Sequence, residues 1–370
     1  MITIINKNIV LVINSLNKGG ASKIISWLAN QLNKDFTDIN IIVFDDSINQ
    51  HFIDENIKIF NLSMYNKTYL FWRLDLIRLL RDKILDISPD LMISFVSDVN
   101  VTLAFALNKT NTPFIIAERG NPYNLNLFWK LLTKVYYKKA TFRVYQTRKV
   151  SSYYEDRDTS KFDVIINPYL NERKINSYID RNVKNLITST GRFEKGKRFH
   201  ILIKAFSRVS KIYPEFQLIL LGDGSEKKNY IKLIKKLELE NKVVLPGYLN
   251  DVDSILFKTM IFAFPSKSEG IPNSVIEAMG IGIPVIFSEM KSGASEMLSQ
   301  KGKRAYFIKK STVKGFEKSI IQLIKNKDLR ESISAHASEI RDEMSPKIIY
   351  GHWINVINKV LGLDKKGNDV

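Results

Sequence analysis

The feature that most constrains the fold is the regular alternation of short apolar runs with helical patterns along the chain. In the first half, the apolar runs that predict strands are 9–13, 39–44, 57–62, 91–95, 114–117 and 142–146. Helical periodicity is clearest over 22–32 and 74–85. Strands that are joined by helices form right-handed βαβ units and a parallel sheet. The sequence therefore predicts an α/β fold.

The same alternation starts again after Asn167-Pro168. Predicted strands follow at 185–190, 218–221, 243–245, 260–264 and 285–287, with helices at 201–213 and 227–237 and another from Asn273. The segment between the halves is polar and has no strand signal, which is typical of a linker. A chain of 370 residues is long enough for two domains. We expect these at 1–170 and 171–344.

The composition excludes some sites and favours an anionic partner. The chain has no cysteine, which rules out a disulfide framework, a thiolate metal site and a cysteine nucleophile. Its formal net charge of +18 is typical of proteins that bind nucleic acid, an anionic membrane or a phosphorylated substrate. The excess is local, because residues 101–150 contain nine Lys or Arg and a single acidic residue, Glu118.

The basic excess includes an aromatic and apolar stretch over 128–139, with lysines between the apolar residues. Basic amphipathic helices often lie on anionic membranes, and the stretch 128–149 is one candidate for such contact. The alternative is a domain helix with a solvated lysine face and an aromatic core face. The first residues lack the features of a secretory signal, and the apolar stretch 91–107 is too short and polar to span a bilayer. We therefore expect a cytoplasmic protein.

The most informative motif runs from Pro265 to Met279, after a predicted strand and into a predicted helix. The amino end of a helix can hold phosphate, and Gly270 allows a ligand to approach the backbone. Glu269 and Glu277 are eight residues apart, one on the loop and one inside the helix. A carboxylate there can accept hydrogen bonds from a ribose diol. The alternative is a capping glutamate and a solvated surface glutamate.

Three further loops also join a predicted strand to a helix. The basic loop 191–198 contains Arg192 and Lys197, which can bind phosphate oxygens, although it can equally be a solvated loop. The second loop, Gly222-Asp223-Gly224, is also consistent with a plain turn. Near the N-terminus, Gly19-Gly20 is not part of a dinucleotide-binding fingerprint.

Together these motifs resemble the retaining nucleotide-sugar glycosyltransferases of family four, of the bacterial surface-polysaccharide type. The matching residues are Glu269, Glu277 and Ala278-Met279; Gly191, Arg192, Lys197 and Ala205-Phe206; Gly222 and Gly224; and Gly19-Gly20. The resemblance implies a GT-B fold, in which two Rossmann-like domains with parallel sheets face a central cleft. It also implies that a C-terminal helix at 345–360 packs back on the first domain.

The implied reaction is transfer of a hexose or N-acetylhexosamine from a UDP-sugar, with retention, to a polyprenyl-diphosphate-linked saccharide in O-antigen or capsule assembly. No metal or other cofactor is implied, and the enzyme would lie on the inner face of the cytoplasmic membrane. The resemblance assigns catalysis to Glu269, Arg192 and Lys197. It assigns donor binding to Glu277, Gly270, Ile271, Pro272, Asn273, Gly222, Gly19 and Gly20.

The chain departs from the family pattern at two places. Lys197-Arg198 stands where the family usually has Lys-Gly, and Lys195-Gly196 comes two residues earlier. Arg119 stands where many members have a histidine, and with Glu118 it is expected on the acceptor side. Two alternatives remain: a GT-B nucleotide-sugar epimerase, and a basic nucleic-acid-binding protein on a Rossmann-like scaffold. No nucleic-acid-binding motif accompanies the charge, so we expect no nucleic acid partner.

Overall fold

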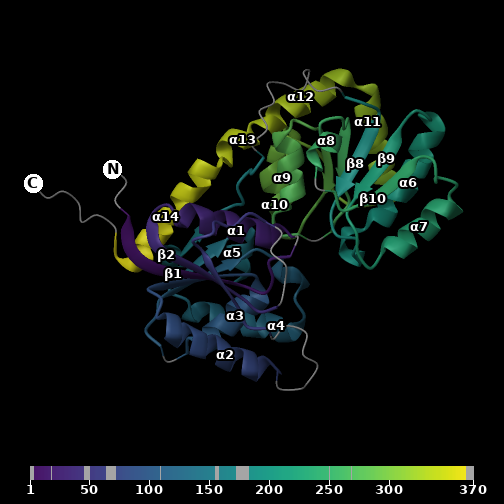
Figure 1. Ribbon diagram of the computed structural model, residues 1–370. Coiled ribbons are helices and arrows are strands. Elements are labelled where there is room, and N and C mark those ends of the chain that lie inside the picture. Colours follow the sequence, from purple (N-terminus) through teal and green to yellow (C-terminus); the bar gives the residue numbers. More distant parts are fainter. Residues whose placement is uncertain are drawn as a thin grey trace, which may run out of the picture. The chain divides into compact units, whose positions relative to one another are not determined.

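The structure is a computed structural model that describes residues 4–17, 19–45, 51–63, 72–108, 110–154, 158–171, 183–249, 251–267 and 269–363. The chain divides into two compact units. Unit 1 contains residues 1–168 and 347–370, and unit 2 contains residues 169–346. Each unit holds one sheet of parallel strands with helices on both faces (Figure 1). This arrangement confirms the α/β fold that the alternating pattern predicts.

Unit 1 is built on a seven-stranded sheet with the order β3-β2-β1-β4-β5-β6-β7. The strands are β1 (Ile5–Ile13), β2 (Phe36–Val43), β3 (Lys58–Asn61), β4 (Leu91–Phe95), β5 (Phe114–Glu118), β6 (Phe142–Tyr145) and β7 (Phe162–Val164). β4 and β5 are buried along their whole length, as expected for central strands of a parallel sheet that helices cover on both faces. The sequence pattern does not predict β7, because three residues with a central aspartate give no apolar run.

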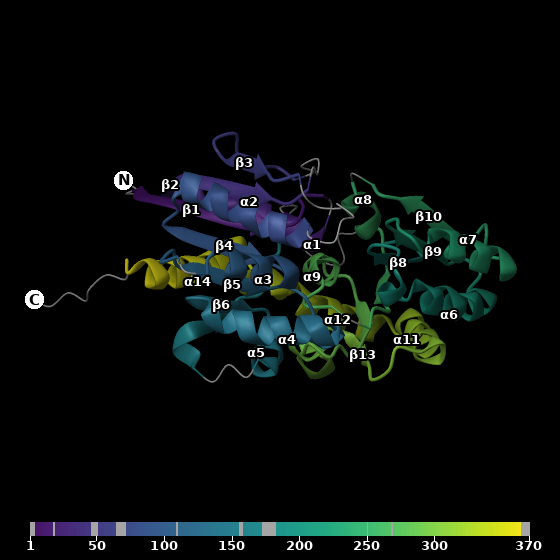
Figure 2. The same ribbon diagram turned by 90° about the horizontal axis from the view of Figure 1, so that it is seen from below.

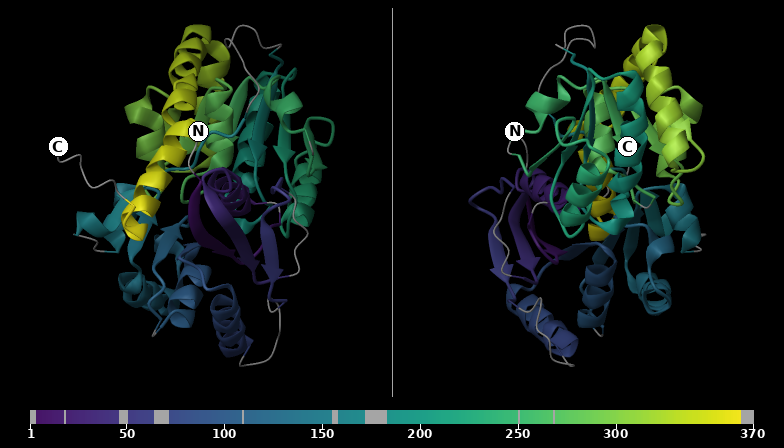
Figure 3. Two further views of the ribbon diagram at one scale, coloured as in Figure 1. Left: turned by 60° about the vertical axis from the view of Figure 1, so that its left-hand side comes forward. Right: turned by 90° about the vertical axis from the view of Figure 1, so that its right-hand side faces the viewer.

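Helices cover both faces of this sheet. Figure 1 shows α1 (Gly20–Leu32) and α14 (Pro346–Leu361) on one side, and α2 (Trp72–Ile87), α3 (Ser97–Ala106) and α4 (Leu127–Tyr136) in a row on the other. Figure 3 shows the same arrangement from two further directions, with the purple α1 and the blue α2 and α3 on opposite sides of the purple strands. α5 (Arg148–Tyr153) follows β6, and its Val150 belongs to the same core as α2 and α3.

The end of the chain completes unit 1. The indole of Trp353 on α14 is fully buried and stacks on Phe95 of β4, with ring centroids 5.8 Å apart. The hydroxyl of Tyr350 donates to a carboxylate oxygen of Asp35 at 2.6 Å. Residues that lie more than 250 positions apart in the sequence therefore share one core.

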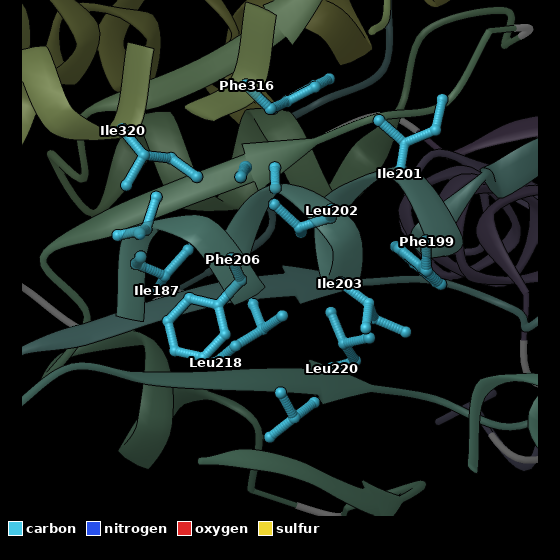
Figure 4. Close-up of a cluster of buried hydrophobic side chains, with 14 of the residues drawn as sticks. Ile187, Phe199, Ile201, Leu202, Ile203, Phe206, Leu218, Leu220, Phe316 and Ile320 are labelled. Atoms are coloured by element: carbon cyan, nitrogen blue, oxygen red, sulfur yellow. The ribbon is translucent and has the colours of Figure 1, made fainter. Parts of the chain in front are cut away.

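Unit 2 is built on a six-stranded sheet with the order β10-β9-β8-β11-β12-β13. The strands are β8 (Leu186–Thr190), β9 (Gln217–Leu221), β10 (Val243–Gly247), β11 (Ile261–Phe264), β12 (Val285–Ser288) and β13 (Tyr306–Ile308). The helices are α6 (Phe199–Ile212), α7 (Lys227–Lys236), α8 (Asp253–Leu256), α9 (Asn273–Gly280), α10 (Ala294–Ser299), α11 (Val313–Lys325), α12 (Lys327–Ser338) and α13 (Ile340–Glu343). Figure 4 shows the core between α6, α11 and the sheet, in which Phe206, Leu218 and Phe316 are fully buried.

The elements also differ from the sequence-based expectation in other places. α1 begins at Gly20, two residues before the predicted start, because the helix continues back into the Gly-Gly loop. The apolar stretch 91–107 contains β4 and α3, which are separated by one residue. The apolar pattern predicts no element over 288–344, where the structure places β13 and helices α10 to α13. Among the described residues, no helix is long and apolar enough to cross a bilayer.

Candidate functional site

Three of the four loops identified in the sequence lie at one edge of the unit 2 sheet. The loops 191–198, 222–224 and 265–272 follow β8, β9 and β11. β9 and β11 are the two neighbours of β8 in the sheet, so the carboxyl ends of all three strands lie side by side. The strand order also reverses here, with β9 on one side of β8 and β11 on the other. In open α/β sheets, ligands bind at such a switch point.

An ion pair joins two of these loops. The ammonium of Lys197 lies 2.7 Å from Oε1 of Glu269, and both side chains are less than one-fifth exposed. The buried hydroxyl of Ser266 donates to the same carboxylate oxygen at 2.6 Å. The ammonium also lies 5.6 Å from the ring centroid of Phe264, within the range of a cation–π contact. The structure thus brings together two of the predicted catalytic residues from positions 72 residues apart in the sequence.

Backbone contacts position this pair. The amide of Lys267 donates to the carbonyl oxygen of Gly196 at 3.4 Å, and the Ser266 hydroxyl lies at the same distance from that oxygen. The two loops are therefore joined directly beside the residues that carry the charges. Ser266 was not predicted as a site residue, although its position three residues before Glu269 in a strand-to-helix loop is a usable signal.

The loop after β9 packs tightly against the loop after β8. Gly222 has a φ of +137°, and a Cβ atom on it would lie 2.1 Å from the carbonyl oxygen of Gly191. Gly224 has a φ of +149°, and its Cβ atom would lie 2.7 Å from the carbonyl oxygen of Phe193. Both positions therefore require glycine for loop packing, whatever they contribute to a ligand. A role of Gly222 in donor binding stays a prediction.

The other basic residues of the loop 191–198 lie differently from Lys197. Arg192 has a side chain that is 63% exposed and pairs with Glu194 at 3.0 Å. Lys195, the alternative lysine, is exposed. Of the basic side chains at 192, 195 and 197, Lys197 is the one that contacts Glu269.

The loop 265–272 leads into α9 with its backbone held in place. The buried hydroxyl of Ser292 donates to the carbonyl oxygen of Gly270 at 3.1 Å. Pro272 precedes the helix, which begins at Asn273, and provides no side-chain cap. A helix without a side-chain cap can offer backbone N–H groups of its first turn to an anion. Ile271 is buried and Asn273 is half-buried.

Glu277, the predicted ribose ligand, lies in the second turn of α9 and is half-buried. Its charge acts on a neighbouring phenol: burial, together with the negative charges of Asp253 and Glu277, raises the pKa of Tyr169 to about 12. Arg341 acts in the opposite direction. Tyr169 therefore stays protonated at neutral pH and can serve as a hydrogen-bond donor.

In unit 1, the Gly-Gly loop precedes α1. Gly19 is the N-cap residue, with an extended φ of −174°, and the hydroxyl of Ser22 donates to its carbonyl oxygen at 2.9 Å. A Cβ atom on Gly19 would have its nearest neighbour at 3.6 Å, which is ordinary contact. Local packing therefore does not require glycine at 19. Gly20 is the first residue of the helix.

Glu118 is the last residue of β5 and is 1% exposed. Its carboxylate accepts hydrogen bonds from Ser97 at 2.7 Å, from Tyr137 at 2.5 Å and from Tyr154 at 3.2 Å, and from the amide of Gly120 at 2.7 Å. Burial, with the adjacent Glu118 carboxylate, raises the pKa of the Tyr154 phenol far above its usual range. Its oxygens are enclosed and already bonded within unit 1, and a place of Glu118 on the acceptor side stays a prediction.

Arg119 lies between two aromatic rings in unit 1. Its guanidinium carbon is 5.1 Å from the ring centroid of Phe95 and 5.3 Å from that of Trp353. Nη1 donates to the carbonyl oxygen of Ile165 at 2.8 Å and to Oδ1 of Asn167 at 3.3 Å. Among the described residues, the buried Nε and Nη2 have no hydrogen-bond partner. Burial lowers the pKa of Arg119 to about 9, so the group still carries its charge at neutral pH.

Residues 171–339 match the family described as glycosyl transferases group 1. The matched residues span nearly all of the second unit. This finding confirms the resemblance that the motifs in the loops after β8, β9 and β11 indicate.

Relatives in sequence support the same assignment. An uncharacterized glycosyltransferase of Methanocaldococcus jannaschii is 33% identical over 238 residues, which cover 58% of this chain and 59% of that protein. The N-acetylgalactosamine-N,N'-diacetylbacillosaminyl-diphospho-undecaprenol 4-alpha-N-acetylgalactosaminyltransferase of Campylobacter jejuni is 39% identical over 111 residues, 30% of each chain. The amylovoran biosynthesis glycosyltransferase of Erwinia amylovora is 26% identical over 195 residues, 52% of this chain and 54% of that protein. The matches thus span about a third to three-fifths of these relatives.

Solved structures show that both units have the arrangement of the GT-B fold. Anabaena HepE in complex with UDP and glucose superposes with a TM-score of 0.79 at 17% identity, over 95% of this chain and all of that one. Sucrose-phosphate synthase from Thermosynechococcus elongatus superposes with a TM-score of 0.81 at 12% identity, over 97% of this chain and all of that one. The predicted GT-B fold is confirmed.

Proposed function

We propose that this chain is a retaining glycosyltransferase that moves a hexose or N-acetylhexosamine from a UDP-sugar to a polyprenyl-diphosphate-linked saccharide in surface-polysaccharide assembly. It would act at the inner face of the cytoplasmic membrane. The observation that carries the donor side is the Lys197–Glu269 ion pair at the switch point of the unit 2 sheet. The UDP in the HepE complex and the undecaprenol-linked substrate in the name of the Campylobacter relative support the choice of donor and acceptor.

In this proposal, the residues of unit 2 divide the work on the donor. Lys197, Arg192 and the amino end of α9 neutralise the diphosphate, while Glu277 accepts hydrogen bonds from the ribose hydroxyls. Gly270 to Asn273 line the phosphate and sugar. Glu269 faces the transferred sugar and holds the Lys197 ammonium beside the leaving oxygen. A role of Gly19 and Gly20 in donor binding, as the resemblance implies, stays a prediction.

The reaction breaks the bond between the anomeric carbon and the β-phosphate oxygen and forms a bond from that carbon to an acceptor hydroxyl on the same face. UDP leaves with the electron pair, and the acceptor proton is released. Negative charge therefore develops on the diphosphate, and positive charge develops on the sugar. A cation paired with a carboxylate can stabilise both developing charges if the cation faces the diphosphate and the carboxylate faces the sugar.

On the acceptor side, Arg119 is the stronger candidate of the two residues predicted there. Its Nη1 atom is used within unit 1, and its buried Nε and Nη2 have no partner there among the described residues, so a planar, bidentate contact with an anion requires the covering side chains to move. The diphosphate of a lipid-linked saccharide is an anion of this kind. Glu118 acts by holding the backbone of the loop that carries Arg119.

The test of this function is an assay of purified protein with UDP- and GDP-sugars, with and without a polyprenyl-diphosphate-linked saccharide. We expect UDP release that requires the acceptor, and a product whose anomeric configuration by NMR equals that of the donor. Conversion of the donor alone would favour the epimerase, and an inverted product would exclude retention. A raised melting temperature with one nucleotide sugar identifies the donor, since a ligand that binds only the native state stabilises it.

Replacing Glu277 by alanine should weaken donor binding more than it slows the reaction of bound donor. A ribose contact is made equally in the ground state and the transition state, so its loss raises KM for the nucleotide sugar with little change in kcat. Steady-state kinetics of Glu277→Ala measures both parameters. Glu296→Ala, which removes an exposed carboxylate from α10, is the matched control. An unchanged KM would remove Glu277 from the donor site.

The enzyme should keep its activity in excess EDTA. In the proposed site, the charge on the departing diphosphate is balanced by Lys197, Arg192 and the amino end of α9. The measurement is the initial rate with and without EDTA, followed by addition of magnesium or manganese. Loss of activity that either ion restores would mean that a metal, and not these groups, neutralises the leaving group.

A further inference from the structure

Helix α4 has an unusual outer face. Four large apolar side chains point to solvent: Leu127 is 73% exposed, Phe128 63%, Leu131 59% and Val135 57%. A spacing of four residues places Leu127, Leu131 and Val135 on one line along the helix, with Phe128 beside it. We call these four residues the outer stripe. Contiguous exposed apolar surface of this kind marks a site of interaction.

The opposite face of α4 supplies its packing. Trp129, Leu132 and Tyr136 pack against the hydrophobic core of unit 1, and Thr133 is buried. Figures 1 and 2 show α4 beside α3, at the end of the row that α2 and α3 begin. The helix is therefore apolar on two faces, and the fold of unit 1 uses one of them. Of the sequence-based alternative, the aromatic core face is confirmed by Trp129 and Tyr136, whereas the outward face is apolar and not a lysine face.

The segment that carries the outer stripe is positively charged. Residues 119–154 include eight Lys or Arg and no Asp or Glu. Lys130 and Lys134 lie on α4 along one edge of the outer stripe, and the exposed Lys138 continues the same spacing. Arg143 is not part of this surface, because it lies on β6 and is 5% exposed.

We propose that the outer stripe inserts into an anionic lipid bilayer, with Lys130, Lys134 and Lys138 at the level of the lipid headgroups. Interfacial helices combine an apolar face with lysines at its border. The outer stripe of α4 is such a face, and it already points to solvent in the folded unit. A second copy of the chain is a poorer match. Symmetric pairing through the outer stripe would bring the lysines of both copies together, and α4 itself has no carboxylate to pair with them.

This inference rests on the proposed function, because docking on a membrane serves an enzyme whose acceptor is held in that membrane. Lipid binding itself is measured without donor or acceptor, so the two can fail separately. A protein that turns over a soluble acceptor analogue but ignores vesicles would overturn the docking surface alone. A protein that binds vesicles but transfers no sugar would overturn the proposed function alone.

The first experiment is co-sedimentation with vesicles of phosphatidylcholine, alone or mixed with phosphatidylglycerol, at low and high salt. We expect the wild type to bind the anionic vesicles and to bind them less at high salt. Phe128→Ser/Leu131→Ser should reduce this partitioning by more than about tenfold, because it removes apolar groups from the lipid. Lys130→Gln/Lys134→Gln/Lys138→Gln should remove most of the preference for anionic over neutral vesicles.

Ile212→Ser/Ile231→Ser is the matched control, because it replaces two apolar side chains of unit 2 that are 56% and 51% exposed. It should bind vesicles like the wild type. The inference is overturned if the wild type ignores anionic vesicles, or if the serine variant in the outer stripe binds them equally well. A stripe variant that changes the sedimentation coefficient of the free protein without any vesicle effect would assign the surface to self-association instead.

A second measurement reports insertion directly. The chain has no cysteine, so Leu131→Cys can be labelled at one place with a polarity-sensitive dye. Anionic vesicles should shift the dye emission to the blue, while the same dye on Ile212→Cys should show no shift. Equal emission of the two labelled proteins in the presence of vesicles would contradict insertion by the outer stripe.

Discussion

Replacing Lys197 by methionine should lower kcat of the transferase reaction by about 10²–10³-fold. Methionine keeps most of the length of the side chain and removes the charge that the leaving diphosphate requires. The structure places this ammonium 2.7 Å from Glu269, at the switch point of the unit 2 sheet. The measurement is UDP release under saturating donor and acceptor. The melting temperature of the variant is checked alongside, because Glu269 loses its counter-charge in a mostly buried setting.

Lys195→Met is the matched control for this prediction. Lys195 lies two residues away in the same loop, carries the same charge and is exposed. If the basic character of the loop were sufficient, the two variants would lose the same activity. We expect Lys195→Met to retain most of its turnover. A Lys197→Met enzyme as fast as the wild type would exclude this lysine from leaving-group stabilisation.

Replacing Glu269 by glutamine should also reduce kcat by at least about 10²-fold, by removing the negative charge that faces the reacting sugar. Glutamine can still accept the hydrogen bond from Ser266, so the loop should keep its conformation. Donor binding should persist, because the Lys197 ammonium is then free to bind the diphosphate. Titration calorimetry with the nucleotide sugar separates binding from turnover.

The double variant Lys197→Met/Glu269→Gln tests whether the pair acts as a unit. Residues in direct contact show non-additive effects, so we expect the double variant to lose much less than the sum of the two single losses. Fully additive losses would mean that each residue acts separately. Full turnover in Glu269→Gln would remove this carboxylate from the reaction.

The two-part α/β organisation follows from the sequence because the relevant physics is local. Apolar runs of strand length between helical patterns can bury their side chains only in sheets covered by helices, and this predicts both parallel sheets. The alternation also places the loops 191–198, 222–224 and 265–272 after strands. Since parallel strands end at one edge, the sequence was enough to identify most of the candidate donor site.

Contacts between distant segments could not be read in the same way. The sequence contains two lysines in one loop, and only the packing of that loop against the loop after β11 assigns Lys197 to Glu269. Gly222 looks like a ligand-binding glycine, yet its backbone approaches Gly191 so closely that packing alone demands it. Such close approaches depend on strand order, which leaves no periodic trace in the sequence.

Burial decided the remaining differences. Glu118 and Arg119 are neighbours in the sequence, but the end of β5 turns the carboxylate into a network of hydroxyls and the guanidinium against Trp353. The pattern of α4 is apolar nearly all round, so sequence alone indicates that the helix is amphipathic but not which face the core takes. Hydrophobicity is a property of each residue, whereas exposure depends on which other elements cover it, and only the tertiary structure specifies that.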